Sequence, residues 1–236
     1  MISVTNVHIL FGCGKNVAFF LNKSLFFGVV SHVLLSLTLL KRKAMNKSIK
    51  GTMTEKNLLT SFAGESQARN RYTYFAKQAM KEGYEQIAAI FLETAEQERM
   101  HAKRMFEHLE GGMVSITAAY PAGVIGTTLE NLKEAAAGEH EEAFELYPAF
   151  AETADHEGFP HIAEMYRRII VAEQAHEKRY QRLMMNIERE QVFTREHEVT
   201  WQCRKCGYIH RGKEAPKKCP ACQHSQAYFQ LEEENF

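Results

Sequence analysis

The stretch Glu96-Gln97-Glu98-Arg99-Met100-His101 places a glutamate three residues before a histidine, and Glu173-Gln174-Ala175-His176 repeats that spacing 75 residues later. Side chains three residues apart lie on one face of a helix. The same offset relates Glu82-Gly83-Tyr84 to Glu157-Gly158-Phe159. Because these matches share one register, we expect two related helical hairpins, which pack together as a four-helix bundle.

The spacing of apolar residues around these stretches predicts where the helices begin and end. Thr54 is a candidate N-cap for the first helix, and Gly83 ends it. Gly111-Gly112 ends the second helix, and Pro148 is expected to kink the third. The expected helices cover about 54–82, 85–110, 128–155 and, after Gly158, up to about 190, with a crossover over 112–127.

Five glutamates and two histidines fall at positions that this spacing assigns to the core. An isolated buried carboxylate is costly unless it is paired or binds a metal. Two Glu-x-x-His pairs with further glutamates from the other two helices form the ligand set of di-iron carboxylate bundles, and manganese suits the same donors. A set of solvated, salt-bridged glutamates is the alternative. The candidate ligands are Glu65, Glu98, His101, Glu139, Glu142, Glu173 and His176.

Two tyrosines are candidates for hydrogen bonds to these ligands. Tyr72 follows Glu65 by seven residues and Tyr147 follows Glu139 by eight, so both side chains can face the same cavity. Ordinary core tyrosines are an equally good interpretation. The remaining histidines are expected at the surface, and they include His140, His108, His156, His161, His197, His210 and His224.

A second metal site is predicted near the C-terminus, where two Cys-x-x-Cys pairs stand twelve residues apart. Four cysteines at this spacing form a closed tetrahedral thiolate site for zinc or a single iron. The segment from residue 200 onward is too short to fold on a hydrophobic core alone, so it needs a metal. Trp201, Tyr208 and Pro220 around Cys203, Cys206, Cys219 and Cys222 resemble a rubredoxin, which favours iron. Cys13 has no expected partner.

The first 44 residues differ in composition from the rest of the chain. They contain five basic residues and no acidic one, and Leu25–Leu40 is largely apolar. This apolar run is shorter than the roughly 20 residues that a membrane helix needs. We expect 1–44 to lie upstream of a true start at Met45, with a membrane anchor as the alternative. The remaining residues carry 24 basic and 29 acidic side chains, a net charge of −5.

A bundle with these ligands followed by a rubredoxin-like segment resembles rubrerythrin, from about Met45 to the C-terminus. Ala63-Gly64-Glu65-Ser66-Gln67-Ala68-Arg69-Asn70-Arg71-Tyr72 and Ala137-Gly138-Glu139-His140 also carry the resemblance. It implies a mainly α fold: a ferritin-like di-iron bundle over 45–192, a linker over 193–199 and a small rubredoxin-like β domain over 200–236. Residues 1–44 inherit nothing from it.

The resemblance also implies a function, namely reduction of hydrogen peroxide to water in the cytoplasm as protection against oxidative stress. Glu98 and Glu173 would bridge two irons, Glu65 and Glu139 would be terminal ligands, and His176 would bind one iron. Glu142 and His101 would exchange on the other iron. Electrons would come through the four-cysteine iron from an NAD(P)H-dependent rubredoxin reductase or a free rubredoxin, within a homodimer or higher homo-oligomer.

Composition excludes some function classes and leaves others open. A neutral chain is not a general nucleic-acid binder, and five cysteines in 236 residues are too few for a disulfide-dense secreted scaffold. No G-x-G-x-x-G follows an expected strand, so the reductant must come from a partner. The alternatives are a ferritin-class ferroxidase or iron-handling protein, a zinc-ribbon adaptor, and a membrane-attached form of the same enzyme.

Overall fold

The first helix of the bundle, α2 (Met53–Lys81), is capped by Thr52 and not by the predicted Thr54. In the computed structural model, which describes residues 47–232, the Thr52 hydroxyl accepts a hydrogen bond from the backbone N–H of Glu55 at 3.1 Å. Thr54 is buried, and its hydroxyl donates to Glu157 Oε2 at 2.6 Å. Thr54 therefore links the start of α2 to the residue that follows the third helix. The predictions for 1–44, including Cys13, lie outside the described residues.

The second helix, α3 (Glu85–Phe106), begins after Gly83, whose φ of 82° suits a glycine at a helix end. It ends before the predicted boundary at residue 110. Glu110 lies beyond the helix end, and its Oε1 accepts a hydrogen bond from the backbone N–H of Ile49 at 3.0 Å. This contact links the segment after α3 to the residues before α2.

The third helix is interrupted by a π-helical segment. A capping box between Thr127 and Glu130 starts α4 (Thr128–Glu141), which continues through η1 (Glu142–Leu146) into α5 (Tyr147–His156). Pro148, the predicted kink, lies in the first turn of α5. Proline has no N–H to donate to the preceding turn, and the wider π turn accommodates that loss.

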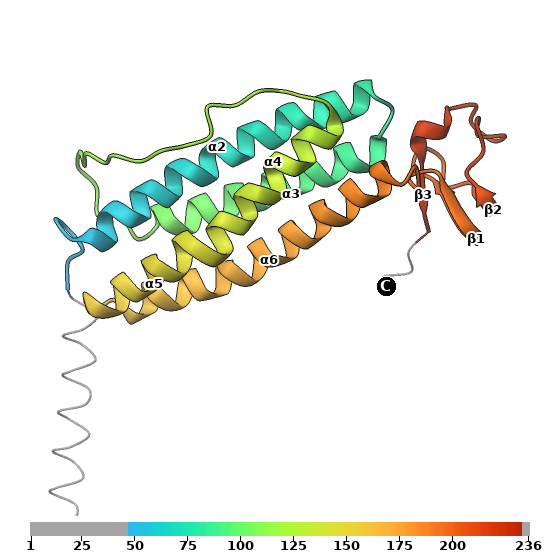
Figure 1. The fold of residues 1–236 in the computed structure, drawn as a ribbon. Helices are drawn as coiled ribbons and strands as arrows, with labels where there is room; N and C mark the ends of the chain where they lie inside the picture. The colour runs from blue at the N-terminus through green and yellow to red at the C-terminus, as the bar shows by residue number, and fades with distance from the viewer. Residues whose placement is uncertain (1–46, 233–236) are drawn as a thin grey trace, which may run out of the picture. The chain divides into compact units, whose positions relative to one another are not determined.

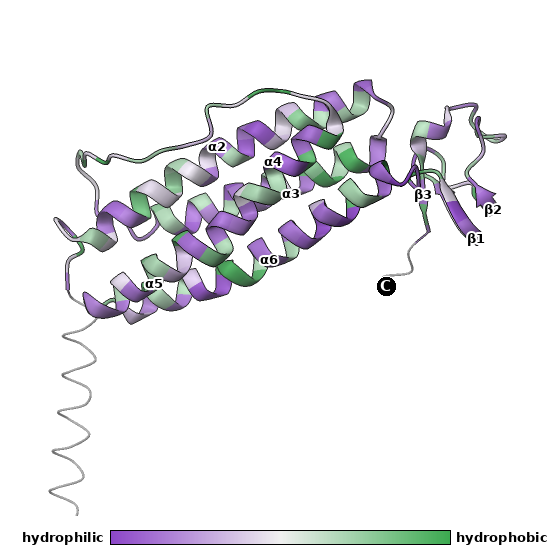
Figure 2. Ribbon diagram, in the orientation of Figure 1, coloured by the Kyte–Doolittle hydropathy of each residue, from purple (hydrophilic) through white to green (hydrophobic). Residues whose placement is uncertain are grey.

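The fourth helix, α6 (Pro160–Glu188), packs against α4 and α5, and α2 packs against α3 (Figure 1). The crossover that precedes α4 runs alongside α2. Hydrophobic and hydrophilic residues alternate along every helix (Figure 2). One apolar cluster includes Phe91, Leu132 and Tyr180, and another includes Leu58 and Tyr166. On each helix the candidate ligands fall between the residues of these two clusters.

The C-terminal segment forms a three-stranded antiparallel sheet in the order β2-β1-β3. Its strands are β1 (Thr194–Cys203), β2 (Ile209–Glu214) and β3 (Phe229–Leu231), with the 3-10 turn η2 (Gln226–Tyr228) before β3. Most of the predicted linker, 193–199, belongs to β1, where the register with β2 is irregular between Thr194 and Val199. The helices and this sheet form one compact unit from Ser48 onward.

No helix in the described part of the chain is long and apolar enough to span a membrane.

Candidate metal centres

Four glutamates, one from each helix of the bundle, are almost completely shielded from solvent. Glu65, Glu98, Glu139 and Glu173 are each at most 1% exposed. They come from α2, α3, α4 and α6, at the level between the two apolar clusters. Four carboxylates in such a place need compensating positive charge, because an unpaired buried charge is strongly destabilising.

The two histidines join these carboxylates in two groups of ligand atoms. Glu65, Glu98, His101 and Glu173 form one group, and Glu98, Glu139, Glu173 and His176 form the other. Within each group the ligand atoms all lie within 4.8 Å of one another. Glu98 and Glu173 belong to both groups, so each offers one carboxylate to two neighbouring positions.

Each histidine presents Nδ1 to more than one carboxylate. His101 Nδ1 lies 2.9 Å from both Glu98 Oε2 and Glu173 Oε1, and His176 Nδ1 lies 3.0 Å from the other oxygen of each glutamate. A single Nδ1–H cannot satisfy two acceptors. Beyond these shared Nδ1 atoms the two Glu173 oxygens have no hydrogen-bond partner, and Glu65 Oε2 is buried with none. Unsatisfied oxygens converging with imidazole nitrogens are the donor set that two divalent cations would complete.

The pKa values within the cluster show the same charge conflict. Burial raises the pKa of Glu65 far above its ordinary value, and burial together with the charge of Glu98 raises the pKa of Glu139 to about 8. Burial would lower the pKa of His176, but hydrogen bonds with Glu139, Glu173 and Glu98 raise it to about 12. Without metal the site can therefore exist only by holding protons, and metal ions would take their place.

Glu142 is the one candidate ligand that lies outside both groups. It is the first residue of η1. Its Oε1 lies beside Gly64 on α2, where a Cβ atom on that glycine would be 3.7 Å from it. Burial raises its pKa, and the charges of Glu139, Glu173 and Glu98 raise it further, so it lies within electrostatic reach of the cluster. π-helical turns in helices are frequent at functional sites.

Both predicted tyrosines donate hydrogen bonds to candidate ligands. The Tyr72 hydroxyl donates to Glu139 Oε1 at 2.6 Å, and the Tyr147 hydroxyl donates to Glu65 Oε1 at 2.5 Å. Both rings are fully buried within the apolar clusters. They fix the orientation of one glutamate in each ligand group.

Gln97 contacts the candidate ligand His176, and the sequence did not predict this contact. Its Oε1 lies 3.0 Å from His176 Nε2, the ring nitrogen that faces away from the carboxylates, and it also accepts a hydrogen bond from Arg179 at 3.1 Å. The internal repeat gives no signal for it, because Ala172 stands at the equivalent position. His140, predicted at the surface, is exposed and lies 3.0 Å from Glu177. The other histidines that were predicted at the surface and fall within 47–232 belong to neither ligand group.

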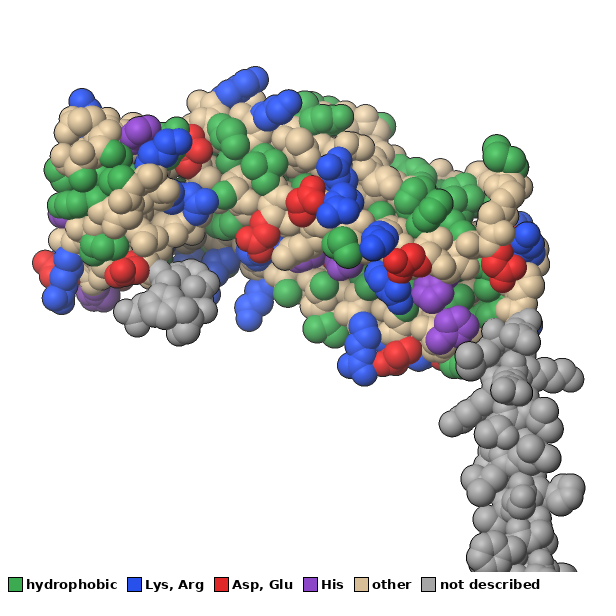
Figure 3. Space-filling model, turned by 180° about the vertical axis from the view of Figure 1, so that it is seen from behind, with side chains coloured by type: hydrophobic (Ala, Val, Ile, Leu, Met, Phe, Trp, Pro, Cys, Tyr) green, Lys and Arg blue, Asp and Glu red, His purple; other side chains and the backbone are tan. Residues whose placement is uncertain are grey.

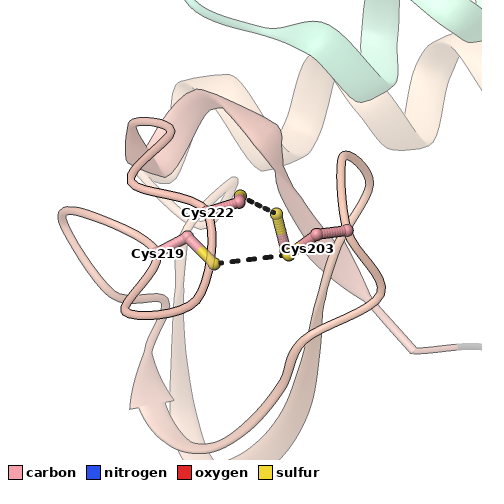
Figure 4. Close-up of side chains that lie close together, drawn as sticks. Cys203, Cys219 and Cys222 are labelled. Atoms are coloured by element: carbon pink, nitrogen blue, oxygen red, sulfur yellow. Dashed lines mark hydrogen bonds between the residues drawn. The ribbon is translucent and has the colours of Figure 1, made fainter.

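The four cysteines of the C-terminal sheet come together as predicted, with their sulfur atoms within 4.8 Å of one another. Cys203, Cys219 and Cys222 point toward one another in Figure 4. The Sγ–Sγ distances are 3.8 Å for Cys203–Cys222 and 3.7 Å for Cys206–Cys219, too long for disulfides. A tetrahedral ion with bonds of about 2.3 Å separates its sulfurs by about 3.8 Å. The spacing therefore fits one metal ion.

Two protein-family models match the chain. One is described as "Rubrerythrin" and matches residues 56–184. The other is described as "Rubrerythrin, rubredoxin-like domain" and matches residues 201–230. The two models coincide with the bundle that holds the carboxylates and with the sheet that holds the cysteines.

Relatives match nearly the whole described chain. A rubrerythrin of Porphyromonas gingivalis is 61% identical over 196 residues, which cover 83% of this chain and 98% of the relative. A rubrerythrin of Nitratidesulfovibrio vulgaris is 56% identical over 185 residues, which cover 78% and 97%.

Solved structures share the fold. The fully reduced, all-ferrous state of nigerythrin has a TM-score of 0.52 at 32% identity and covers 79% of this chain and 92% of its own. Dithionite-reduced symerythrin from Cyanophora paradoxa has a TM-score of 0.52 at 24% identity and covers 61% and 89%, which indicates a common fold alone. The predicted mainly α, ferritin-like fold with a rubredoxin-like domain is confirmed.

Proposed function

The chain belongs to the rubrerythrin family, and we propose that it reduces hydrogen peroxide to water with electrons that arrive through its four-cysteine site. The bundle holds a di-iron site with carboxylate and histidine ligands, and the C-terminal domain holds a rubredoxin-like four-cysteine site. The overall reaction takes up two electrons and two protons for each peroxide and yields two waters. The two irons supply the two electrons together when bound.

The observation that carries this proposal is the sharing of Glu98 and Glu173 between the two ligand groups. Carboxylates that contact both positions hold two ions close enough to act on one small molecule. We assign Glu98 and Glu173 as bridging ligands. Glu65 and Glu139 are terminal ligands, and each is oriented by a tyrosine hydroxyl.

His101 and Glu142 are assigned as alternative ligands of the same position. The structure has His101 within the ligand group and Glu142 outside it, at the start of the π turn. π turns inside helices occur frequently at functional sites, which supports a role for Glu142. His176 is assigned as a permanent ligand, because Gln97 Oε1 accepts a hydrogen bond from its Nε2–H and fixes the orientation of the ring. This arrangement supports an exchange on one side of the site only.

The surroundings favour chemistry with a small, uncharged oxidant. Apolar clusters enclose the ligands on both sides along the bundle, and they exclude bulk water and large substrates. Tyr72 and Tyr147 are the hydroxyl donors that touch terminal ligands, so they can retain hydrogen bonds to those oxygens while peroxide is bound.

The reductant is proposed to come from outside the chain, through an NAD(P)H-dependent rubredoxin reductase or a free rubredoxin. A one-electron site in the same chain as a two-electron site supports a relay in which single electrons are collected. We further propose that the protein works in the cytoplasm as a homodimer or higher homo-oligomer, in which the four-cysteine site of one chain serves the bundle of another.

A stoichiometric titration tests the proposal. The protein is reduced anaerobically with dithionite, freed of excess reductant and mixed with increasing hydrogen peroxide. We expect three peroxides consumed for every two chains, because each reduced chain holds two electrons at the di-iron site and one at the four-cysteine iron, with water as product and no accumulation of further iron. Aerobic uptake of many irons per chain, with slow peroxide consumption, would instead assign the protein to the ferroxidase class.

A further inference from the structure

A groove of about 990 Å³ lies between α3, the end of α6 and the C-terminal sheet, and its charge is opposite to that of the chain around it. Residues 45–236 carry a net charge of −5, yet Glu93 is the only acidic residue among the described residues that line this groove. Figure 3 shows Lys and Arg side chains beside the recess. The five basic residues of this arginine groove are Arg179, Arg182, Arg189, Arg195 and Arg204.

Most of this positive charge is not neutralised by the chain. Arg179 pairs with Glu93 at 2.9 Å, whereas Arg182 and Arg189 form no ion pair with any described residue. The Arg195 guanidinium lies 5.6 Å from the centre of the Trp201 ring. Burial lowers its pKa, and the neighbouring charge of Arg182 lowers it further. Like charges held this close favour binding of an anionic partner.

The arginine groove is lined by residues that lie next to each of the two metal centres. Arg204 stands between Cys203 and Cys206 in the sequence of the first Cys-x-x-Cys pair. At the other side, Arg179 donates to Gln97 Oε1, and the same oxygen lies 3.0 Å from His176 Nε2. One surface therefore borders the thiolate cluster and is two hydrogen bonds away from a candidate iron ligand.

We propose that the arginine groove is the docking site for the acidic face of a small one-electron carrier protein. This inference rests on the proposed function, which requires an external electron donor. In each encounter one electron passes from the reduced carrier to the oxidised four-cysteine centre, so the carrier is oxidised by one electron, the centre is reduced by one, and no bond or proton is exchanged. The five arginines extend from the last turns of α6 to the residue after β1. Charge spread over this length suits a protein face better than a single phosphate, and clustered charge speeds such encounters.

Charge reversal at two exposed groove residues tests the proposal. The probe is a zinc-substituted, net negatively charged rubredoxin, which binds but cannot transfer electrons. Its affinity for the full-length, iron-loaded protein is measured by titration calorimetry at low and at high salt. The variant Arg182→Glu with Arg189→Glu should weaken binding at low salt by about tenfold or more and flatten its salt dependence.

The matched control makes the same charge change elsewhere. Lys56 and Lys77 are exposed on α2 and do not line the arginine groove. The double variant Lys56→Glu with Lys77→Glu should keep wild-type affinity. An equal loss in both variants would show a general charge effect and overturn the proposal, as would unchanged binding in the groove variant.

Two further readouts separate this inference from its alternatives. Peroxide consumption by dithionite-reduced protein should be unchanged in the groove variant, so a failure of the peroxidase proposal is detected without the carrier. Sedimentation velocity reports the oligomeric state. If the groove variant dissociates an oligomer that the control leaves intact, the groove is a contact between copies of this chain and the docking proposal is wrong.

Discussion

The Tyr72 hydroxyl donates a hydrogen bond of 2.6 Å to Glu139 Oε1, and neither side chain is more than 2% exposed. Removing the hydroxyl leaves a buried carboxylate oxygen without its donor. Tyr72→Phe should therefore lower the iron affinity of the bundle roughly 10- to 100-fold, the usual effect of losing a contact to a metal ligand. Iron retention during chelator challenge measures this.

Tyr166→Phe is the matched control for Tyr72→Phe. Tyr166 is equally buried, but its hydroxyl bonds with Ser61 Oγ at 3.1 Å and touches no candidate ligand. We expect it to cost about 1 kcal/mol of unfolding free energy without changing iron retention. If both variants lost iron equally, the Tyr72 hydroxyl would have no specific role at the metal site.

Glu98 belongs to both ligand groups and Glu65 to one, so their isosteric variants should differ in iron content. We expect Glu98→Gln to lose about two irons per chain and Glu65→Gln about one, because a bridging carboxylate holds both ions. The four-cysteine iron should remain in each. Elemental analysis after reconstitution measures the content, with exposed Glu96→Gln as the control. Equal losses in the two variants would contradict the assigned bridging role.

The ligand-bearing helices could be predicted from the sequence, because both the internal repeat and the spacing of apolar residues can be recognised in it. Glu98 and Glu173 sit at one repeat offset on apolar faces, and a buried glutamate has few structural explanations. The cap at Thr52 could not be distinguished from Thr54, since both residues can cap and only the contact of Thr54 with Glu157 decides. Element boundaries depend on such tertiary contacts.

Contacts between helices could not be predicted from the sequence, for a different reason. Gln97 meets His176 only because α3 and α6 pack at this register, and nothing in its own spacing marks it. The π turn at Glu142 reflects how the chain accommodates Pro148 within a continuous helix, where the sequence predicted a kink. Local propensity indicates a disturbance there but not its form.

The metal-free protein should become less stable as pH rises. The folded-state pKa of Glu139, about 8, exceeds its ordinary value, so stability is lost as pH rises from about 4.5 through 8. The pKa of His101 is raised to about 10 by hydrogen bonds with Glu173 and Glu98 against the opposing effect of burial, so its contribution is complete below pH 6.5 and is lost above it. Thermal unfolding of the apo-protein at pH 5 to 9 should show a falling Tm.

Iron should reverse this trend, because metal ions and protons compete for the same atoms. The Tm increase on adding ferrous iron anaerobically should grow from pH 5 to pH 8. Glu96→Gln, at an exposed site, should follow the wild-type curves. An apo-protein whose Tm rises over this range would contradict the protonated state of the cluster.

Trp201 is the only tryptophan of the chain, and it is fully buried in the small core that also contains Cys203 and Cys219. Because this core is too small to fold without the metal, Cys219→Ser should expose Trp201 and shift its fluorescence to the red. The bundle has its own apolar clusters, so helical circular dichroism should change little. Glu98→Gln is the control, since it empties the bundle site and should leave Trp201 buried. A Trp201 spectrum unaffected by Cys219→Ser would mean that the C-terminal sheet folds without its metal.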